Sequence, residues 1–189
     1  MHLKLILSIL AALPSMLAQE TPSTNYRLRA DLKPGQPDKT VYDGLYLSSY
    51  HTGAGLNDAV FYSKDPSDGI VGQLNGTNGT AQTFNLGTAF PWSMFMVPYA
   101  STYAAWQPVR IDAGEGGHSD RGLGGGFFIN GTGLQWAEAG TGSADGYPFA
   151  GWMVCDWWHG VPQLFFRMQY YNDTTPASCA DVYLCPEYQ

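Results

Sequence analysis

Residues 151–167 read GWMVCDWWHGVPQLFFR, and no other stretch says as much about the fold. Two extended runs flank a short polar loop, Asp156–Gly160, whose tip carries Trp157 and Trp158. The second run, residues 163–171, alternates with the period of two that marks a strand with one buried face. Its apolar face consists of Leu164, Phe166, Met168 and Tyr170. The stretch therefore predicts two strands joined by an aromatic loop in a β-core.

Similar strand-like runs recur along the rest of the chain. Each is bounded by Gly, Pro, Asn or Asp, as strands are; they cover residues 26–30, 44–50, 59–62, 82–86, 93–99 and 109–112. Residues 127–129 and 134–137 flank Asn130-Gly-Thr-Gly, which is a strong hairpin signal. The longest helical possibility, residues 100–106, is about two turns, so the pattern predicts an all-β protein.

A weak internal repeat bears on how these strands are arranged. Extended runs adjoin Asn78, Asn130 and Asn172, at intervals of 52 and 42 residues. Three pseudo-repeats of this length favour one compact, β-trefoil-like barrel. A two-sheet sandwich has nearly the same strand spacing and remains the alternative. In either case we expect residues 19–189 to form a single domain.

The first eighteen residues predict a secretory signal peptide. The apolar run Leu5–Leu13 suits a signal sequence and is well short of the roughly 20 residues that span a bilayer. Pro14 ends the run, and Ala18 precedes a predicted cleavage before Gln19. We therefore expect a protein that is secreted, in the medium or the cell wall, without membrane insertion.

Three cysteines in an exported chain predict one disulfide and one cysteine left over. We favour Cys155–Cys179, with Cys155–Cys185 as the alternative. The favoured bridge closes a loop of about 25 residues, which is worth roughly 3 kcal/mol on the chain-entropy model. Four N-x-T sequons, a signal for N-glycosylation on surface turns, agree with export; they begin at Asn75, Asn78, Asn130 and Asn172.

The charge balance argues against nucleic acid as a partner. The formal net charge is −7, and the nine Lys and Arg residues are scattered rather than clustered. Phosphate contacts need such clusters. We expect no cofactor and no metal. The loop Asp112–Asp120 has oxygen ligands but does not match a calcium-loop pattern, so we interpret it as a Gly-rich connection.

Four runs of this chain carry a resemblance to a known group of proteins. They are residues 44–61 (GLYLSSYHTGAGLNDAVF), 84–92 (FNLGTAFPW), 126–136 (GFFINGTGLQW) and the opening stretch 151–167. In these runs the chain resembles a family of small secreted proteins of filamentous fungi. It is more loosely similar to fungal cell-wall and secreted-antigen proteins. The resemblance implies a fungal, secreted or wall-associated glycoprotein and no particular reaction.

Sequence patterns for catalysis are weak, so we expect a non-enzymatic protein. No G-x-S-x-G motif follows a strand, and the predicted mature N-terminus is not a histidine. Glycoside hydrolysis, the enzymatic alternative, needs two carboxylates about 5–9.5 Å apart. Candidates for such a pair are Asp156, Glu138, Asp112 and Glu115. An effector or inhibitor of a host protein is a further alternative without a distinguishing residue.

The preferred hypothesis is binding of carbohydrate or a surface partner through aromatic side chains. Aromatics make up 14% of the chain, and Trp and Tyr join apolar rings to polar atoms. The candidate ligand-binding residues are Tyr50, His51, Asp156, Trp157, Trp158 and His159. We expect Trp136, Trp152 and Phe166 in the core. The core is also favoured for Trp157 and Trp158, but neighbours cannot both point inward from a regular strand, so at least one should be exposed.

Overall fold

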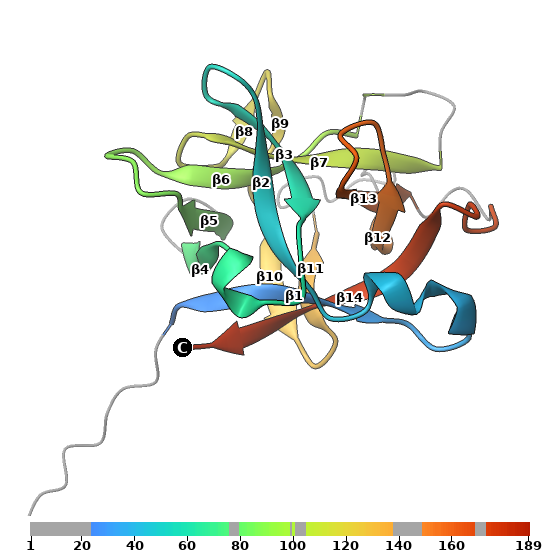
Figure 1. Cartoon of the computed structure of the whole chain (residues 1–189). Coiled ribbons are helices and arrows are strands. Elements are labelled where there is room, and N and C mark those ends of the chain that lie inside the picture. Colours follow the sequence, from blue (N-terminus) through green and yellow to red (C-terminus); the bar gives the residue numbers. More distant parts are fainter. Residues whose placement is uncertain (1–23, 76–79, 99, 101–104, 138–148, 169–172) are drawn as a thin grey trace, which may run out of the picture.

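The computed structural model describes residues 24–75, 80–98, 100, 105–137, 149–168 and 173–189. The predicted signal peptide therefore lies outside the described residues, as do Asn78, Asn172, Glu138 and Tyr170. Strands make up 57% of the structure and helices 6%, so the structure is nearly all β. Within the described part of the chain, antiparallel strands close into a nine-stranded β-barrel (Figure 1). The all-β barrel prediction is confirmed, and the trefoil-like arrangement stays a prediction.

The elements follow one another with short connections. In chain order the strands are β1 (Tyr26–Leu32), β2 (Leu45–Gly53), β3 (Leu56–Phe61), β4 (Val71–Asn75), β5 (Ala81–Asn85), β6 (Trp92–Met96), β7 (Trp106–Ala113), β8 (His118–Ser119), β9 (Gly122–Leu123), β10 (Phe127–Asn130), β11 (Gly133–Trp136), β12 (Phe149–Asp156), β13 (Pro162–Met168) and β14 (Cys179–Tyr188). Two 3-10 turns, Pro37–Tyr42 and Pro66–Asp68, lie between strands. None of the helices in these residues is long and apolar enough to cross a membrane.

The first and last strands close the barrel. β1 pairs with β14 along its whole length, from Tyr26 opposite Tyr188 to Leu32 opposite Val182. The two strands run side by side across the lower part of Figure 1. β1 also pairs with β2 and β4, and β14 continues the sheet through β12 and β13. Pairing the two ends of the sheet satisfies backbone groups that an open edge would expose.

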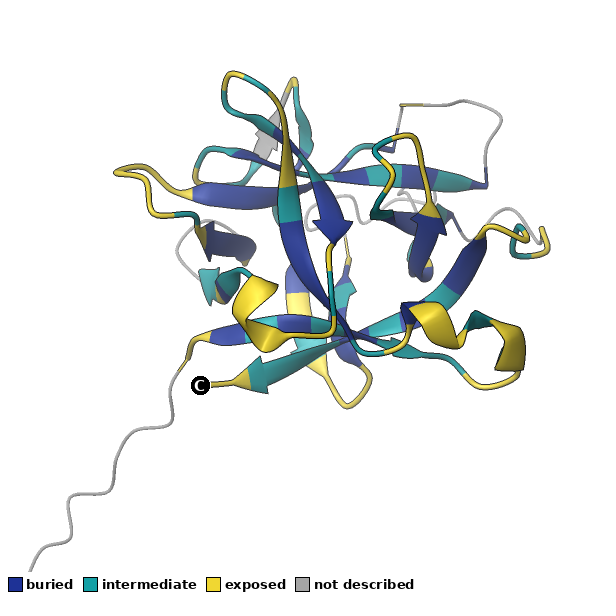
Figure 2. Cartoon of the chain, in the orientation of Figure 1, coloured by how far each residue is buried: buried dark blue, intermediate teal, exposed yellow. Residues whose placement is uncertain are grey.

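The core is the apolar interior of this barrel. Trp152, Phe166 and Trp136 are 2% exposed or less, as predicted. Figure 2 shows the burial concentrated on the strands and the exposure on the connections. The β10–β11 hairpin, predicted at Asn130, adds core side chains and is tied in by the Trp152 indole, whose N–H donates to Leu134 O at 2.6 Å.

The hairpin and β14 lie in close contact at Gly133. This glycine has φ +93°, and a Cβ built on it would lie 2.2 Å from the backbone oxygen of Leu184. Any other residue would clash with a carbonyl that belongs to the sheet and cannot easily move. Gly133 therefore permits the hairpin to pack against the barrel.

The predicted disulfide, Cys155–Cys179, is confirmed. Its cysteines lie opposite each other on β12 and β14 and pack with Met153 and Phe165 in a small apolar cluster. Cys185 is the free cysteine. Burial, followed by the neighbouring Asp31, raises the pKa of its thiol to about 11, which keeps it in the less reactive protonated form.

Several strand boundaries differ from the predicted ones. β4 and β14 fall outside the predicted runs, and at residues 53–56 a tight turn joins β2 and β3 into a hairpin where two separate runs were predicted. Gly55 has φ +71° there, which allows the chain to reverse. This hairpin places Tyr50 directly opposite Asp58, and both residues belong to the candidate site.

Candidate functional site

The loop between β12 and β13 turns its tryptophans outward. Trp157 is 49% exposed and Trp158 is 74% exposed, so the expectation that they are core residues is wrong for both. The physical reason is the turn: Asp156 pairs with Pro162, and Gly160 N–H bonds to Trp157 O at 3.2 Å, so residues 157–160 leave the sheet. The neighbour argument, which required at least one exposed indole, is confirmed.

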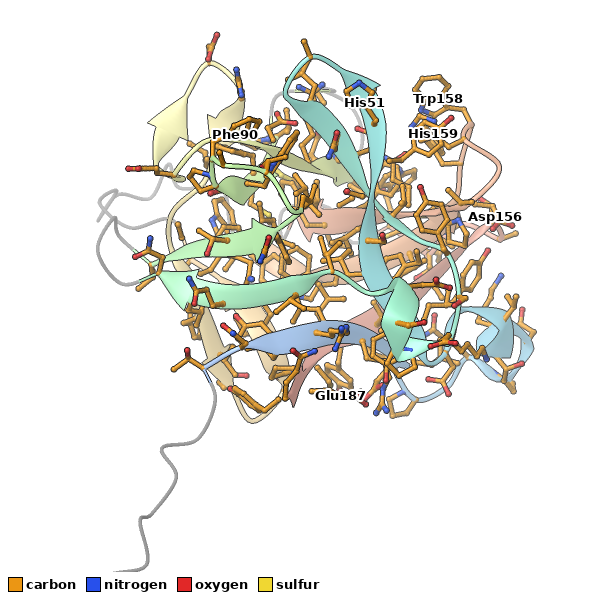
Figure 3. The ribbon with its side chains drawn as sticks, turned by 60° about the vertical axis from the view of Figure 1, so that its left-hand side comes forward. His51, Phe90, Asp156, Trp158, His159 and Glu187 are labelled. Carbon is orange, nitrogen blue, oxygen red and sulfur yellow. A yellow bond between two sulfur atoms is a disulfide. The ribbon has the colours of Figure 1, made fainter. Side chains whose placement is uncertain are left out.

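Three rings from two distant segments form a stack at this loop. The His159 ring lies 4.1 Å from the Tyr50 ring and 4.0 Å from the Trp158 ring, measured between centroids. The planes of Tyr50 and His159 lie 24° apart, as in stacked rings, whereas Trp158 is tilted by 35° relative to His159. Figure 3 shows Trp158 and His159 together at one end of the barrel. Trp158 is therefore supported by packed rings even though most of its own surface faces solvent.

A buried polar contact holds this stack in place. His159 Nε2 lies 2.6 Å from Asp58 Oδ2, and the two side chains are only 3% and 14% exposed. Because the His159 Nε2–H donates to the largely buried carboxylate of Asp58, this hydrogen bond is stronger than an ion pair on the protein surface. It connects residues 101 positions apart. The contact holds the loop Asp156–Gly160, here called the tryptophan loop, against the β2–β3 hairpin.

Further aromatic surface surrounds the stack. Tyr62 is 46% exposed and donates its hydroxyl to Ser49 O at 3.3 Å. Partial burial, and then the nearby Tyr50, raise the pKa of Tyr62. Trp157 packs edge-on against Phe165 at 5.2 Å. We call the exposed set Tyr50, Tyr62, Trp157 and Trp158 the aromatic platform.

Two of the predicted ligand-binding residues lie away from the stack. His51 follows Tyr50 on β2, and its Nδ1 lies 3.2 Å from Asn57 Oδ1 near the hairpin turn. The Asp156 carboxylate lies beside Tyr42, and burial together with this carboxylate raises the pKa of the Tyr42 hydroxyl. Figure 3 shows Asp156 separated from Trp158 and His159. Of the predicted residues, Tyr50, Trp158 and His159 are thus in ring contact, and Trp157 lies in the same loop with its ring against Phe165.

Sequence reasoning missed Asp58 and Tyr62. A local signal existed for Asp58: alternating residues on both sides of the glycines at 53 and 55 indicate a hairpin, which would have paired Tyr50 with Asp58. For the contact between Asp58 and His159 no local signal exists, because it depends on which strands become neighbours in the barrel.

The carboxylates proposed for hydrolysis occupy different environments. Asp112 on β7 is fully buried; its Oδ1 accepts from Asn57 N–H at 3.0 Å, and its Oδ2 has no hydrogen-bond partner among the described residues. Burial raises the pKa of Asp112, although Arg110 and Arg121 act in the opposite direction. Asp156 ends β12 and is exposed, so it lies in different surroundings from the buried Asp112 on β7.

Of the four predicted glycosylation sites, Asn75 and Asn130 lie in the described part of the chain. Asn130 is exposed at its hairpin, and its Oδ1 accepts from the Thr132 N–H and hydroxyl at 2.9 and 2.7 Å. Asn75 ends β4. In the described part of the chain no three His, Cys, Asp or Glu side chains are grouped closely enough to hold a metal ion.

Comparison with known proteins identifies a family but does not identify an activity. Residues 23–188 match the model of a family described as a domain of unknown function, DUF7907. No curated protein and no solved structure matches the chain.

Proposed function

We propose that this chain, which belongs to the DUF7907 family, is a secreted, non-catalytic glycoprotein that binds carbohydrate through its aromatic platform. The observation that carries the proposal is Trp158, an indole that is 74% exposed yet packed against an anchored histidine. Several exposed rings close together, unlike a single exposed ring, often form a contact surface. Here it is also pre-organised, which reduces the entropy lost on binding.

The chemistry of the platform suits a sugar. The apolar face of a pyranose ring can stack on an exposed indole or phenol, while phenolic hydroxyls hydrogen-bond its hydroxyl groups. Tyr50, whose ring stacks on His159, and Tyr62, which lies near Tyr50, supply such hydroxyls. The surface is built on a barrel whose rigid strands hold both hairpins, so its rings keep their relative positions.

Export supports an extracellular carbohydrate as the ligand. The Cys155–Cys179 disulfide is compatible with an oxidising compartment, which is where such bonds persist. The four sequons and the predicted signal peptide agree with secretion. The fungal resemblance of the sequence directs the proposal to cell-wall polysaccharide, with a surface protein as the alternative partner.

Retention on insoluble polysaccharides tests this proposal. The double variant Trp157→Ala/Trp158→Ala should elute without delay from a column that retains the unaltered protein, because the stacking surface is gone. Phe128→Ala is the matched control, since this ring is 41% exposed on β10, away from the platform. Circular dichroism should show that both variants keep the β-structure. Equal retention of all three proteins would refute the platform as the binding surface.

A further inference from the structure

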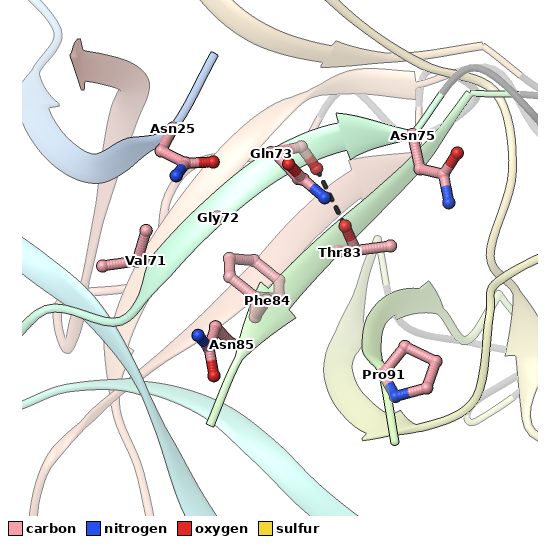
Figure 4. Close-up of a pocket in the computed structure, with 9 residues that line it drawn as sticks. All are labelled: Asn25, Val71, Gly72, Gln73, Asn75, Thr83, Phe84, Asn85 and Pro91. Carbon is pink, nitrogen blue, oxygen red and sulfur yellow. Dashed lines mark hydrogen bonds between the residues drawn. The ribbon is translucent and has the colours of Figure 1, made fainter. Parts of the chain in front are cut away.

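A cavity on another part of the barrel has the character of a binding site. It measures about 300 Å³ and lies over the β4–β5 hairpin, with Asn25 before β1 and Pro91 before β6 forming its sides (Figure 4). The register pairs Gln73 with Thr83 and Val71 with Asn85, so these four side chains share one face of the hairpin. β1 separates β4 from β2, so the cavity is distinct from the aromatic platform.

The lining of this cavity is polar and uncharged. All nine lining residues are neutral, although the chain carries a net charge of −7; they are Asn25, Val71, Gly72, Gln73, Asn75, Thr83, Phe84, Asn85 and Pro91. Side-chain amides both donate and accept hydrogen bonds, as hydroxyl-rich ligands require. A charged ligand would lose water without gaining an opposite charge, which is unfavourable.

The hydrogen bonds that these polar groups already make show which of them can donate to a ligand and which can accept from it. Thr83 donates its hydroxyl to Gln73 O at 3.2 Å, so its oxygen lone pairs are left to accept. Asn85 Oδ1 accepts from Gly87 N–H at 2.9 Å, so its amide nitrogen supplies donors. Gln73 is exposed and brings both a donor and an acceptor. A ligand with alternating hydroxyls would satisfy all three residues.

The apolar part of the lining comes from Val71, Phe84 and Pro91. A Cβ on Gly72 would lie 2.7 Å from Gln82 Nε2 and 3.0 Å from two ring carbons of Phe84, so the glycine leaves room for both side chains. Amides beside apolar side chains match the two kinds of surface on a sugar ring. A volume near the lower limit of small-molecule sites suits one ring rather than a chain.

We propose that this cavity binds one neutral sugar residue of the N-acetylhexosamine type. The amide of such a sugar pairs with side-chain amides, and its hydroxyls pair with Thr83 and Gln73. The sugar has two sources. It is either the first residue of a glycan attached to Asn75, which itself lines the cavity, or a free saccharide. The proposal does not depend on the aromatic platform.

Amide chemical shifts of ¹⁵N-labelled protein test this site. The starting form is Thr77→Ala, which removes the Asn75 sequon and leaves the Asn75 side chain unchanged. Titration with N-acetylglucosamine should shift the amides of Gln73, Thr83 and Asn85, whereas glucuronic acid should not. Gln73→Ala should weaken this binding about fivefold, the loss expected for one or two hydrogen bonds. The matched control Gln135→Ala, on β11, should leave it unchanged.

The source of the sugar is decided by repeating the titration with protein that carries a glycan at Asn75. Shifts in the Thr77→Ala form alone support the proposal and assign the attached glycan as the occupant. Shifts in both forms support it and assign a free saccharide. If neither form responds to the neutral sugar, or if glucuronic acid binds equally well, the proposal is overturned. Trp158→Ala should bind N-acetylglucosamine at the cavity normally, which separates this test from that of the platform.

Discussion

Removing the Asp58 carboxylate should loosen the tryptophan loop and destabilise the fold. In Asp58→Ala the His159 ring, 3% exposed, loses the acceptor 2.6 Å from its Nε2. A hydrogen bond to a charged group is worth about 1.5–3 kcal/mol, and loss of one partner of a buried pair costs up to about 5 kcal/mol. Asp58 is 14% exposed, so water partly replaces it, and we expect a loss of about 2 kcal/mol.

Urea unfolding followed by tryptophan fluorescence measures this loss. A double-mutant cycle of Asp58→Ala and His159→Ala isolates the pair, and its coupling energy should exceed about 1 kcal/mol. The control is Asp38→Ala, because this carboxylate lies 3.7 Å from Lys39 Nζ and is 75% exposed. Such surface pairs contribute about 0–1 kcal/mol. A coupling energy near zero, or equal losses in Asp58→Ala and Asp38→Ala, would refute the idea that this contact anchors the loop.

Three further perturbations have definite expected outcomes. Gly133→Ala should lower the free energy of unfolding, measured by thermal unfolding, by about 3 kcal/mol or more, because its Cβ would lie 2.2 Å from a backbone oxygen of β14. The control Gly131→Ala, with open space around it, should lower this free energy far less. Replacing Cys155 and Cys179 by serine should lower the free energy of unfolding by about 3 kcal/mol, and a loss below 1 kcal/mol in urea would contradict the loop-closure argument. Burial raises the pKa of Asp112 in the folded state, so its contribution to stability is present below the unfolded pKa and is lost as pH rises through the folded pKa. The variant Asp112→Asn does not titrate at this position. In urea titrations its free energy of unfolding, relative to that of the unaltered protein, should therefore increase from about pH 3 to about pH 7.

Local patterns predicted most of the strands and favoured the correct pair of cysteines. Leu164, Phe166 and Met168 alternate with residues of the other face, and this period of two depends only on the geometry of an extended chain. The hairpin at Asn130 follows from turn residues that tolerate positive φ. Cys155–Cys179 was favoured over Cys155–Cys185 on the prediction that the chain is exported, and the structure contains this bridge.

Strand pairing, by contrast, was decided only by the tertiary structure. The partner of β1 is β14, at the other end of the chain, and alternation within β1 is the same whichever strand lies beside it. For this reason the sequence left a barrel and a sandwich as alternatives. The same limit explains Asp156, which adjoins Trp157 in sequence but faces Tyr42. A period of two says that neighbours face opposite ways and not which way each faces.

The sequence by itself determined that this is an all-β chain with one disulfide and an aromatic loop after β12. Only the tertiary structure decided that the loop lies on the β2–β3 hairpin, where Asp58 holds His159 and His159 supports Trp158. The physical reason is the range of the interactions. Strand period and turn chemistry act over a few residues, whereas the position of the His159 ring that supports Trp158 depends on a contact between residues 101 positions apart, which forms only when the barrel closes.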